Sequence, residues 1–292
     1  MSQKRLLSSC KIGIVPLNWR YTDDRKEFVT AKLSEYGFVG LQISQQQALS
    51  SVYRELFKAN KLEVAELYVA IKCTPDSVLS DAEQLSKVAI DAAKAAGTEM
   101  IVFAVDGSED RDLVAANAEN GPSLTNSGYL QLARHINHWA EYSNSLGMRA
   151  SFHPHAATYI ETPGETRQLF KLLNENVGLC LDVGHWIVGG GDPIKAVVEY
   201  GSRITHIHVK DVDPKILARL KSKELKSMES AVSDFKLFAP AGTGALDLTA
   251  LFSELENIGY QGWLMSEQDS AWEPAEEKSL LSYANITKAL AC

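Results

Sequence analysis

The chain alternates between two hydrophobic patterns. Short apolar runs typical of buried strands are followed by longer stretches in which apolar residues recur every three or four positions, as in amphipathic helices. The expected strands lie at 11–16, 38–43, 64–71, 99–105, 148–153, 177–182, 204–210 and 262–267. The expected helices lie at 24–36, 46–60, 76–96, 124–146, 163–174, 192–200, 247–258 and 275–290.

Eight strand–helix pairs predict a parallel α/β sheet, because each parallel crossover needs a helix. Eight such units close most simply into a single (β/α)8 TIM barrel that spans residues 1–292. Glycines follow many of the expected helices, as is typical of helix C-termini. These glycines are Gly37, Gly97, Gly147, Gly201 and Gly259. An open doubly wound sheet is the alternative, but no Gly-x-Gly-x-x-Gly follows the first strand.

Composition and charge narrow the function classes. The 292 residues are 45% hydrophobic and carry a net charge of −8, which disfavours nucleic acid as a partner. No apolar run approaches the roughly 20 residues that span a membrane. The N-terminal segment lacks the features of a signal peptide, and the four cysteines show no paired spacing, so we expect a cytoplasmic protein. The oligomeric state stays open, a homo-oligomer included.

The histidines are unevenly placed. Of seven, His135 and His138 lie in an expected helix, where packing or surface roles suffice. The other five lie in or just after the fifth, sixth and seventh expected strands. They are His153, His155, His185, His206 and His208. Because a TIM barrel builds its active site at the C-terminal ends of its strands, this placement indicates a functional site there.

Strand periodicity brings three of these strand ends together. Residues two apart share a face of a strand, so Asp182, His208 and Glu267 are all expected to point into the barrel mouth. Two carboxylates and an imidazole are typical ligands of Mn²⁺, Co²⁺, Fe²⁺, Mg²⁺ or Zn²⁺. The alternative is a buried salt-bridged network, which needs cations to neutralise the carboxylates. Lys210 is the nearest basic residue in these segments.

Several segments resemble a known family. "LDVGHW", "ITHIHVKDV" and "GWLMSEQD" resemble the xylose isomerase-like TIM-barrel superfamily of sugar isomerases, epimerases and dehydratases. Within it the chain is most similar to the inosose dehydratases, also through "GIVPLNW" and "HPHAATYIET". The likeness covers nearly the whole chain. It departs at the second strand, which carries Gln42 near the place where those dehydratases usually have an acid.

The resemblance implies metal ligands at Asp182, His208 and Glu267. Many members complete the set with a glutamate on the fifth strand, where this chain has Ser151 and His153 at the inward positions. We therefore expect Glu161, in the following loop, to be the fourth ligand, with His153 as the alternative.

The resemblance also implies substrate contacts. His185 is expected to contact substrate hydroxyls, unless it only packs near the ligands, and Lys210 to donate to a substrate oxygen, unless it is a surface ion pair. His155 and Asp269 are expected to contribute to substrate binding. Trp19 either forms an apolar wall for a sugar ring or caps the barrel. Glu161, Glu267, His153, His185 and Lys210 are the candidate catalytic residues.

The expected reaction uses one divalent ion, Mn²⁺ or Co²⁺ first and Zn²⁺, Mg²⁺ or Fe²⁺ otherwise. The ion polarises a polyhydroxy ketone so that an enediolate forms, and loss of a hydroxyl gives an inosose dehydratase-like lyase. A sugar isomerase or epimerase of a free or phosphorylated ketose is the alternative. A non-catalytic sugar-binding barrel is a further one. The trinuclear zinc nucleases of related fold need additional histidines on earlier strands, and residues 1–134 contain none.

Two segments beside the expected site have interpretations of their own. Residues 189–191, a glycine triplet without basic neighbours, are expected to form a turn rather than a phosphate cradle. The connection 211–246 is long for a loop of this kind. We expect its segment 214–244 to form part of the pocket wall, with the "FAPAGTG" end near the metal.

Overall fold

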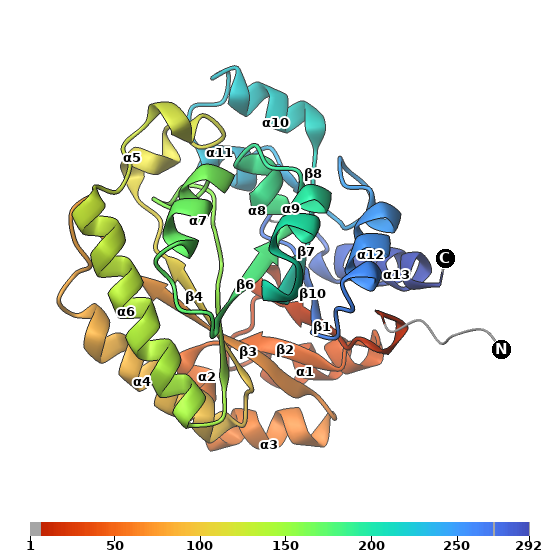
Figure 1. Cartoon of the computed structure of the whole chain (residues 1–292). Coiled ribbons are helices and arrows are strands. Elements are labelled where there is room, and N and C mark those ends of the chain that lie inside the picture. The colour runs from red at the N-terminus through yellow and green to blue at the C-terminus, as the bar shows by residue number, and fades with distance from the viewer. Residues whose placement is uncertain (1–6, 271, 292) are drawn as a thin grey trace.

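A closed barrel of eight parallel strands forms the centre of the computed structural model, which describes residues 7–270 and 272–291 (Figure 1). The strands are β1 (Ile12–Val15), β2 (Gly40–Ile43), β3 (Glu63–Ile71), β4 (Met100–Val105), β5 (Arg149–Phe152), β6 (Val177–Asp182), β7 (Ile204–Val209) and β10 (Leu264–Glu267). They follow the order β1-β10-β7-β6-β5-β4-β3-β2 around the barrel. The expected (β/α)8 barrel is therefore confirmed, and the open sheet is excluded.

Helices surround the barrel and cover the outer faces of its strands (Figure 1). The main ones are α1 (Lys26–Glu35), α2 (Gln45–Leu49), α3 (Ser51–Ala59), α4 (Ala82–Ala96), α6 (Asn126–Ser145), α7 (Pro163–Phe170), α9 (Pro193–Tyr200), α12 (Leu248–Asn257) and α13 (Ala275–Leu290). Gly97 ends α4 with φ 80°, a left-handed conformation that glycine adopts without the steric cost of a side chain.

Two expected helices differ from those observed. The stretch 46–60 is broken at Ser50, whose extended backbone (φ −85°, ψ 121°) separates α2 from α3. Residues 76–81 precede α4 without being helical, and Val78 instead forms a bridge with Cys73. In both places the apolar spacing continues through a local break in the backbone that the spacing does not reveal.

Shorter elements decorate the C-terminal end of the barrel. They are α5 (Glu109–Asp112), α8 (Val183–Val188), α10 (Pro214–Lys221), α11 (Met228–Ser233) and a two-stranded antiparallel sheet of β8 (Asp211–Val212) and β9 (Phe238–Ala239). Single 3-10 turns lie at Leu7–Ser9, Leu17–Trp19, Ala118–Asn120 and Gly201–Arg203. The connection 211–246 is thus a small substructure of two helices and two strands rather than an open loop.

The other end of the barrel is filled by apolar side chains. Trp263, which precedes β10, and Met265 of β10 pack with Val15 and Ala65. Gly13 and Gly40 make room for them, since a Cβ at Gly13 would lie 2.5 Å from Met265 Sδ and one at Gly40 2.5 Å from Trp263 Cη2. This packing forms the floor of the barrel and leaves the C-terminal end for polar side chains.

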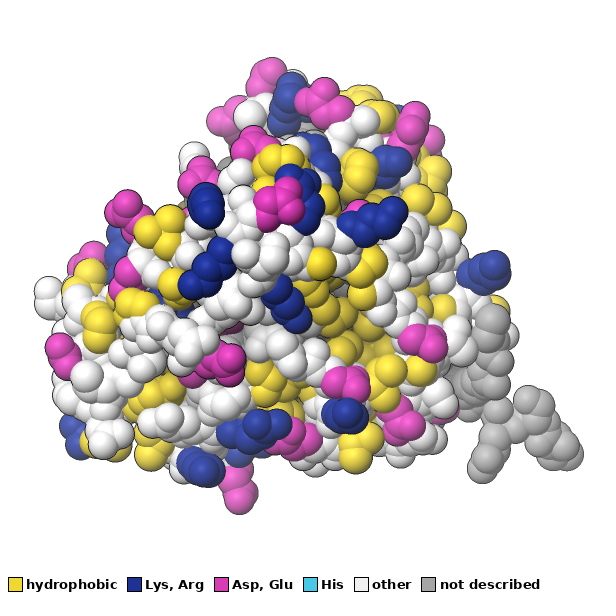
Figure 2. Space-filling model, turned by 90° about the horizontal axis from the view of Figure 1, so that it is seen from above, with side chains coloured by type: hydrophobic (Ala, Val, Ile, Leu, Met, Phe, Trp, Pro, Cys, Tyr) yellow, Lys and Arg dark blue, Asp and Glu magenta, His cyan; other side chains and the backbone are white. Residues whose placement is uncertain are grey.

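Surface and cysteine chemistry are unremarkable. Acidic and basic side chains are interspersed over the face seen in Figure 2, without a patch of one sign. Among the described residues, no helix combines the length and the apolar character needed to cross a membrane. Cys10, Cys73 and Cys180 are free thiols, and Cys292 lies outside the described residues.

Candidate metal centre

Four side chains meet where β5, β6, β7 and β10 end. One possible ligand atom from each of His153, Asp182, His208 and Glu267 lies within 4.8 Å of all the others, and all four residues are buried. His208 Nδ1 lies 2.5 Å from Glu267 Oε2 and 3.6 Å from Asp182 Oδ2, and His153 Nε2 lies 3.5 Å from the same aspartate oxygen. The structure thus brings Asp182, His208 and Glu267 together, as the strand pattern predicts.

The orientation of Asp182 follows from its place at a strand-to-helix junction. It is the last residue of β6 and the N-cap of α8, and its Oδ1 accepts the backbone N–H of His185 at 2.8 Å. This hydrogen bond satisfies one of the free amides at the start of the helix. It also leaves Oδ2 facing the other three side chains.

Lys210 brings a positive charge to the same group. Its Nζ lies 3.1 Å from Asp182 Oδ2, 3.0 Å from Glu267 Oε1 and 2.5 Å from Asp269 Oδ2, and the side chain is fully buried. Burial alone would lower the pKa of Lys210, but the three carboxylates outweigh it and hold that pKa above its ordinary value. Lys210 is therefore part of the buried site, and the surface ion pair is excluded.

The charges within the group act on one another. Burial would raise the pKa of Glu267, but Lys210 and His208 lower it to about 2. Burial likewise opposes ionisation of Asp182, and Lys210 with the nearby histidines holds its pKa well below the ordinary value. For Asp269 burial prevails over Lys210 and raises the pKa to about 8. Two ionised carboxylates therefore face the two histidines.

The chemistry of the donor atoms fits a divalent cation. Asp182 Oδ2, Glu267 Oε2 and His208 Nδ1 face one another and are buried without a hydrogen-bond partner. Buried polar atoms are normally hydrogen-bonded, so a group of them that converge on one place needs a further partner. Lys210 neutralises part of the negative charge, but it leaves these atoms without a hydrogen bond. Carboxylate and imidazole donors of this kind suit Mn²⁺, Fe²⁺, Co²⁺ or Zn²⁺.

Glu161, the expected fourth ligand, lies outside this group. Its two carboxylate oxygens accept the backbone N–H groups of Ala116 and Ala157, each at 2.8 Å, and Oε2 lies 4.0 Å from the guanidinium of Arg111. Burial raises the pKa of Glu161 to about 7. The Glu161 side chain thus connects two loops, whereas His153, the alternative, lies with the other three side chains, and its role as the fourth ligand stays a prediction.

A comparison with known protein families identifies the family of the chain. Residues 30–285 match the family model described as xylose isomerase-like TIM barrel. The chain belongs to the xylose isomerase-like TIM-barrel family. It is 25% identical over 288 residues to the rhizopine catabolism protein MocC of Rhizobium meliloti, which covers 96% of this chain and 87% of that protein.

Two further proteins extend the comparison within the xylose isomerase-like family. The chain is 27% identical to the inosose dehydratase of Geobacillus kaustophilus, over 92% of this chain and 91% of that one. The solved structure of the 3-keto-D-glucoside 4-epimerase YcjR from E. coli superimposes with a TM-score of 0.72, covering 96% of this chain and 99% of that chain. At 16% identity this second likeness shows the shared fold alone.

Three of the remaining expected site residues lie in two different places: His155 and His185 lie beside Lys210, and Trp19 lies against α13. His155 and His185 stack with ring centroids 3.6 Å apart, and His185 Nε2 lies 3.7 Å from Asp269 Oδ2, beside Lys210. Trp19 is instead buried, and its Nε1 donates to Ser279 Oγ of α13 at 3.0 Å. Trp19 is therefore packed against α13, and its expected contact with substrate stays a prediction.

The glycine triplet is a turn, as expected. Gly190 has φ 85°, and a Cβ at Gly189 would lie 2.3 Å from the backbone oxygen of Glu161. Close packing against the loop after β5 therefore requires glycine here.

The substructure 211–246 reaches the site through Phe238. The ring of Phe238 lies 4.5 Å from Lys210 Nζ and 5.0 Å from the ring of His185. Asp211 holds the far end of the segment, because its carboxylate accepts the backbone N–H groups of Val212, Gly244 and Leu246. The "FAPAGTG" segment thus begins against Lys210 and ends against Asp211, so it lies beside the site, and its role as a pocket wall stays a prediction.

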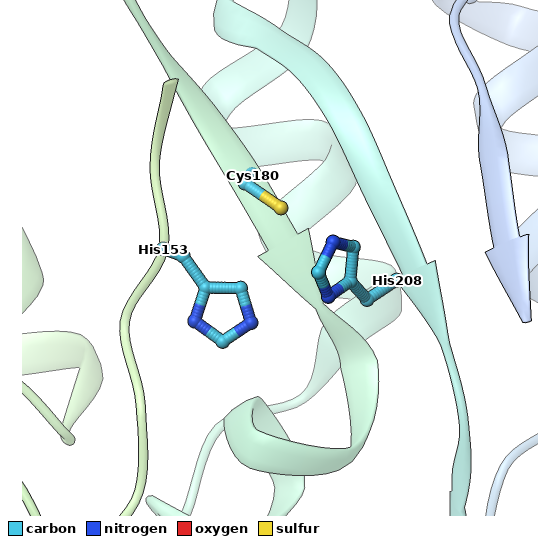
Figure 3. A group of neighbouring side chains, drawn as sticks. All are labelled: His153, Cys180 and His208. Atoms are coloured by element: carbon cyan, nitrogen blue, oxygen red, sulfur yellow. The ribbon is translucent and has the colours of Figure 1, made fainter. Parts of the chain in front are cut away.

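The sequence analysis did not identify two residues near the group formed by His153, Asp182, His208 and Glu267, called the metal group below. Cys180 points from β6 toward the rings of His153 and His208 (Figure 3), and the three form a second set of possible ligands. The second residue is Glu66 of β3, whose Oε2 lies 2.5 Å from His206 Nε2 and 3.0 Å from His208 Nε2. The available signal was an acid in the middle of the apolar run 64–71, on the inward face of a strand.

Proposed function

We propose that the protein is a metal-dependent enzyme that dehydrates a cyclic polyhydroxy ketone such as inosose. The convergence of His153, Asp182, His208 and Glu267, with donor atoms that no hydrogen bond satisfies, carries the proposal. The curated relatives support the substrate class and the lyase reaction, since they include inosose dehydratases similar over about nine-tenths of this chain.

The four side chains would hold the divalent ion. When bound, such an ion supplies Lewis-acid polarisation of the substrate carbonyl, which acidifies the neighbouring C–H. The nearby carboxylates contribute two negative charges, and Lys210 keeps them ionised. His153, unlike Glu161, supplies a neutral nitrogen donor, so the site carries one negative charge fewer than a three-carboxylate set.

Three side chains around the ligands are suited to move protons or hold substrate oxygens. His155 Nδ1 donates to the carbonyl oxygen of Ala156 at 2.7 Å, which leaves Nε2 as a lone-pair acceptor. His185 Nδ1 accepts the N–H of Ala156 at 3.3 Å, so its Nε2 carries the proton and donates. Lys210 is a third donor. Burial lowers the pKa of His155 to about 3 and keeps both rings neutral.

These roles suit dehydration through an enediolate. His155 Nε2 accepts the proton from the carbon next to the ketone, and His185 or Lys210 donates to the hydroxyl that leaves. An isomerase or epimerase would share the first step and return the proton to carbon instead. The observation that favours this second function is Gln42, which lies near the position where inosose dehydratases usually have an acidic residue.

A test of the reaction is direct. Inosose incubated with the enzyme and Mn²⁺ or Co²⁺ should give rising near-ultraviolet absorbance and a product lighter by one water in mass spectrometry. Glu267→Gln should abolish both signals, because it removes a charged ligand. Inert inosose, together with deuterium uptake and inversion at one carbon of a free ketose, would replace the dehydratase with the epimerase. Full metal occupancy without turnover of either substrate class would favour a binding protein.

A further inference from the structure

Glu66 enters the site from the opposite wall of the barrel. It lies on β3, which is four strands away from β7 in either direction around the ring (Figure 1). Its side chain is fully buried and spans the interior to reach the two histidines of β7. Interior positions of a TIM barrel are usually filled by bulky apolar side chains, so a carboxylate here calls for an explanation.

Among the described residues, the hydrogen-bond and ion-pair partners of the Glu66 carboxylate are imidazoles. Oε2 lies 2.5 Å from His206 Nε2 and 3.0 Å from His208 Nε2, where it accepts a hydrogen bond. Within residues 7–270 and 272–291, no lysine or arginine pairs with this carboxylate. A buried carboxylate without such a cation costs several kcal/mol, by the general estimate of about that size for each buried ion. A glutamate at this costly position therefore indicates a function that involves these two histidines.

The two ring nitrogens of His208 face different partners. Nε2 faces Glu66 Oε2, whereas Nδ1 faces Glu267 Oε2 and Asp182 Oδ2 in the metal group. A neutral imidazole has one protonated nitrogen and one lone pair, and a hydrogen-bond acceptor at one nitrogen keeps the proton there. Acceptors face both nitrogens, so a cation held by Glu267 and Asp182 would take the Nδ1 lone pair, and Glu66 would keep the remaining proton on Nε2.

We propose that Glu66 is a positioning residue that fixes the ring orientation and tautomer of His208, so that His208 binds the metal through Nδ1. This inference rests on the metal site proposed above. A carboxylate behind a ligand histidine raises the basicity of that ligand and holds its ring in place. His206 shares the same glutamate oxygen and so helps to keep the carboxylate between the two rings.

Glu66→Gln is the main test, with Asp211→Asn as the matched control. Both replace a fully buried carboxylate by an amide, but Asp211 binds loop amides and no member of the metal group. Glu66→Gln should weaken Co²⁺ binding about 10- to 100-fold in a competition titration and shift the visible spectrum of bound Co²⁺. Asp211→Asn should lower the melting temperature and leave Co²⁺ affinity within about twofold of the wild type, since the ligands are untouched.

A second measurement uses the wild-type chain and does not depend on the folding of a variant. In the Zn²⁺-loaded protein, nitrogen-15 spectra of His208 should show the proton on Nε2 and the metal on Nδ1. The reverse assignment, or unchanged Co²⁺ affinity and spectrum in Glu66→Gln, would overturn the role of Glu66 alone. Loss of a second metal equivalent in Glu66→Gln would make Glu66 a ligand instead and overturn it too. A wild type that takes up no metal would overturn the metal site itself.

Discussion

Two buried groups of carboxylates lie near the C-terminal end of the barrel and differ in how their oxygens are satisfied. In one group Arg111 contacts both oxygens of Glu165, at 2.8 and 3.1 Å, and Glu161 accepts two backbone amides. In the metal group, by contrast, Asp182 Oδ2 and Glu267 Oε2 have no hydrogen-bond partner. Burial alone therefore does not distinguish a structural acid from a functional one.

The first group has a clear structural purpose. The amides that Glu161 holds belong to Ala116 and Ala157, both of which have a φ of 63°. A left-handed conformation costs alanine roughly 1–2 kcal/mol, so the carboxylate stabilises two unfavourable turns. Glu165 also completes a capping box with Thr162 at the start of α7. A complete set of local donors indicates a structural role, whereas acceptors that face one another without donors fit a cation-binding role.

The largest expected effect is on stability and lies in the first group. Glu165→Ala leaves the guanidinium of Arg111 buried without its bidentate partner, so we expect about 3–5 kcal/mol of destabilisation. Urea unfolding followed by circular dichroism would measure it. Metal affinity of the folded fraction should stay at the wild-type value. A large loss of affinity would mean that the two groups are one functional unit.

The next effect is on metal affinity and lies in the second group. Asp182→Asn keeps an oxygen to cap α8 but removes the ligand charge, so we expect metal binding to weaken at least about 100-fold, or roughly 2.7 kcal/mol. Metal analysis of the dialysed protein by mass spectrometry would show the loss. The melting temperature of the metal-free protein should change little. Full metal occupancy in this variant would remove Asp182 from the site.

A pH effect separates the groups further. The folded protein raises the pKa of Glu161 from 4.5 to about 7, so the folded state binds a proton more tightly than the unfolded chain. The contribution of Glu161 is therefore present below pH 4.5 and is lost as the pH rises toward 7. The stability difference between wild type and Glu161→Gln should fall by on the order of 2–3 kcal/mol from pH 4.5 to pH 8. Paired unfolding curves that stay parallel across this range would contradict it.

The smallest expected effect decides the fourth ligand. His153→Gln should weaken metal binding about tenfold, or 1.4 kcal/mol, because it removes a neutral donor. Glu161→Gln should leave the affinity near the wild-type value, because this carboxylate already binds two amides. Isothermal titration of the two variants side by side would decide. The opposite order would return Glu161 to the site and imply that the loop after β5 moves when metal binds.

Much of the fold could be predicted from the sequence, since the alternation of apolar runs and amphipathic stretches reflects the periods of strands and helices. The inward faces of Asp182, His208 and Glu267 followed from the same period. The same period placed His153 on the inward face of its strand, but it could not decide between His153 and Glu161 as the expected fourth ligand, because Glu161 lies in an irregular loop without strand or helix periodicity. Its direction is set by Ala116 and Arg111, which are 45 and 50 residues away in the chain.

The contact of Glu66 with the histidines of β7 could not be predicted for a different reason. The strand and the inward face of Glu66 could be read from the sequence, but its partner lies on the opposite wall, and distances across a barrel depend on closure and register. A register shift between Leu179 and Cys180 places Cys180 beside His206 and Asp182 beside His208. Local periodicity cannot foresee such a shift, so the neighbours of a strand-end residue need the structure.

The apolar floor formed by Trp263 and Met265 has a consequence for proton traffic. With this end filled by side chains, the proposed site is open to substrate and solvent at the C-terminal end of the barrel, the side on which Phe238 lies. If His155 takes the proton from substrate, as proposed, that proton either returns to the product or exchanges with solvent at this same end. Isotope washout during turnover therefore compares the rate of proton exchange at His155 with the rate of turnover.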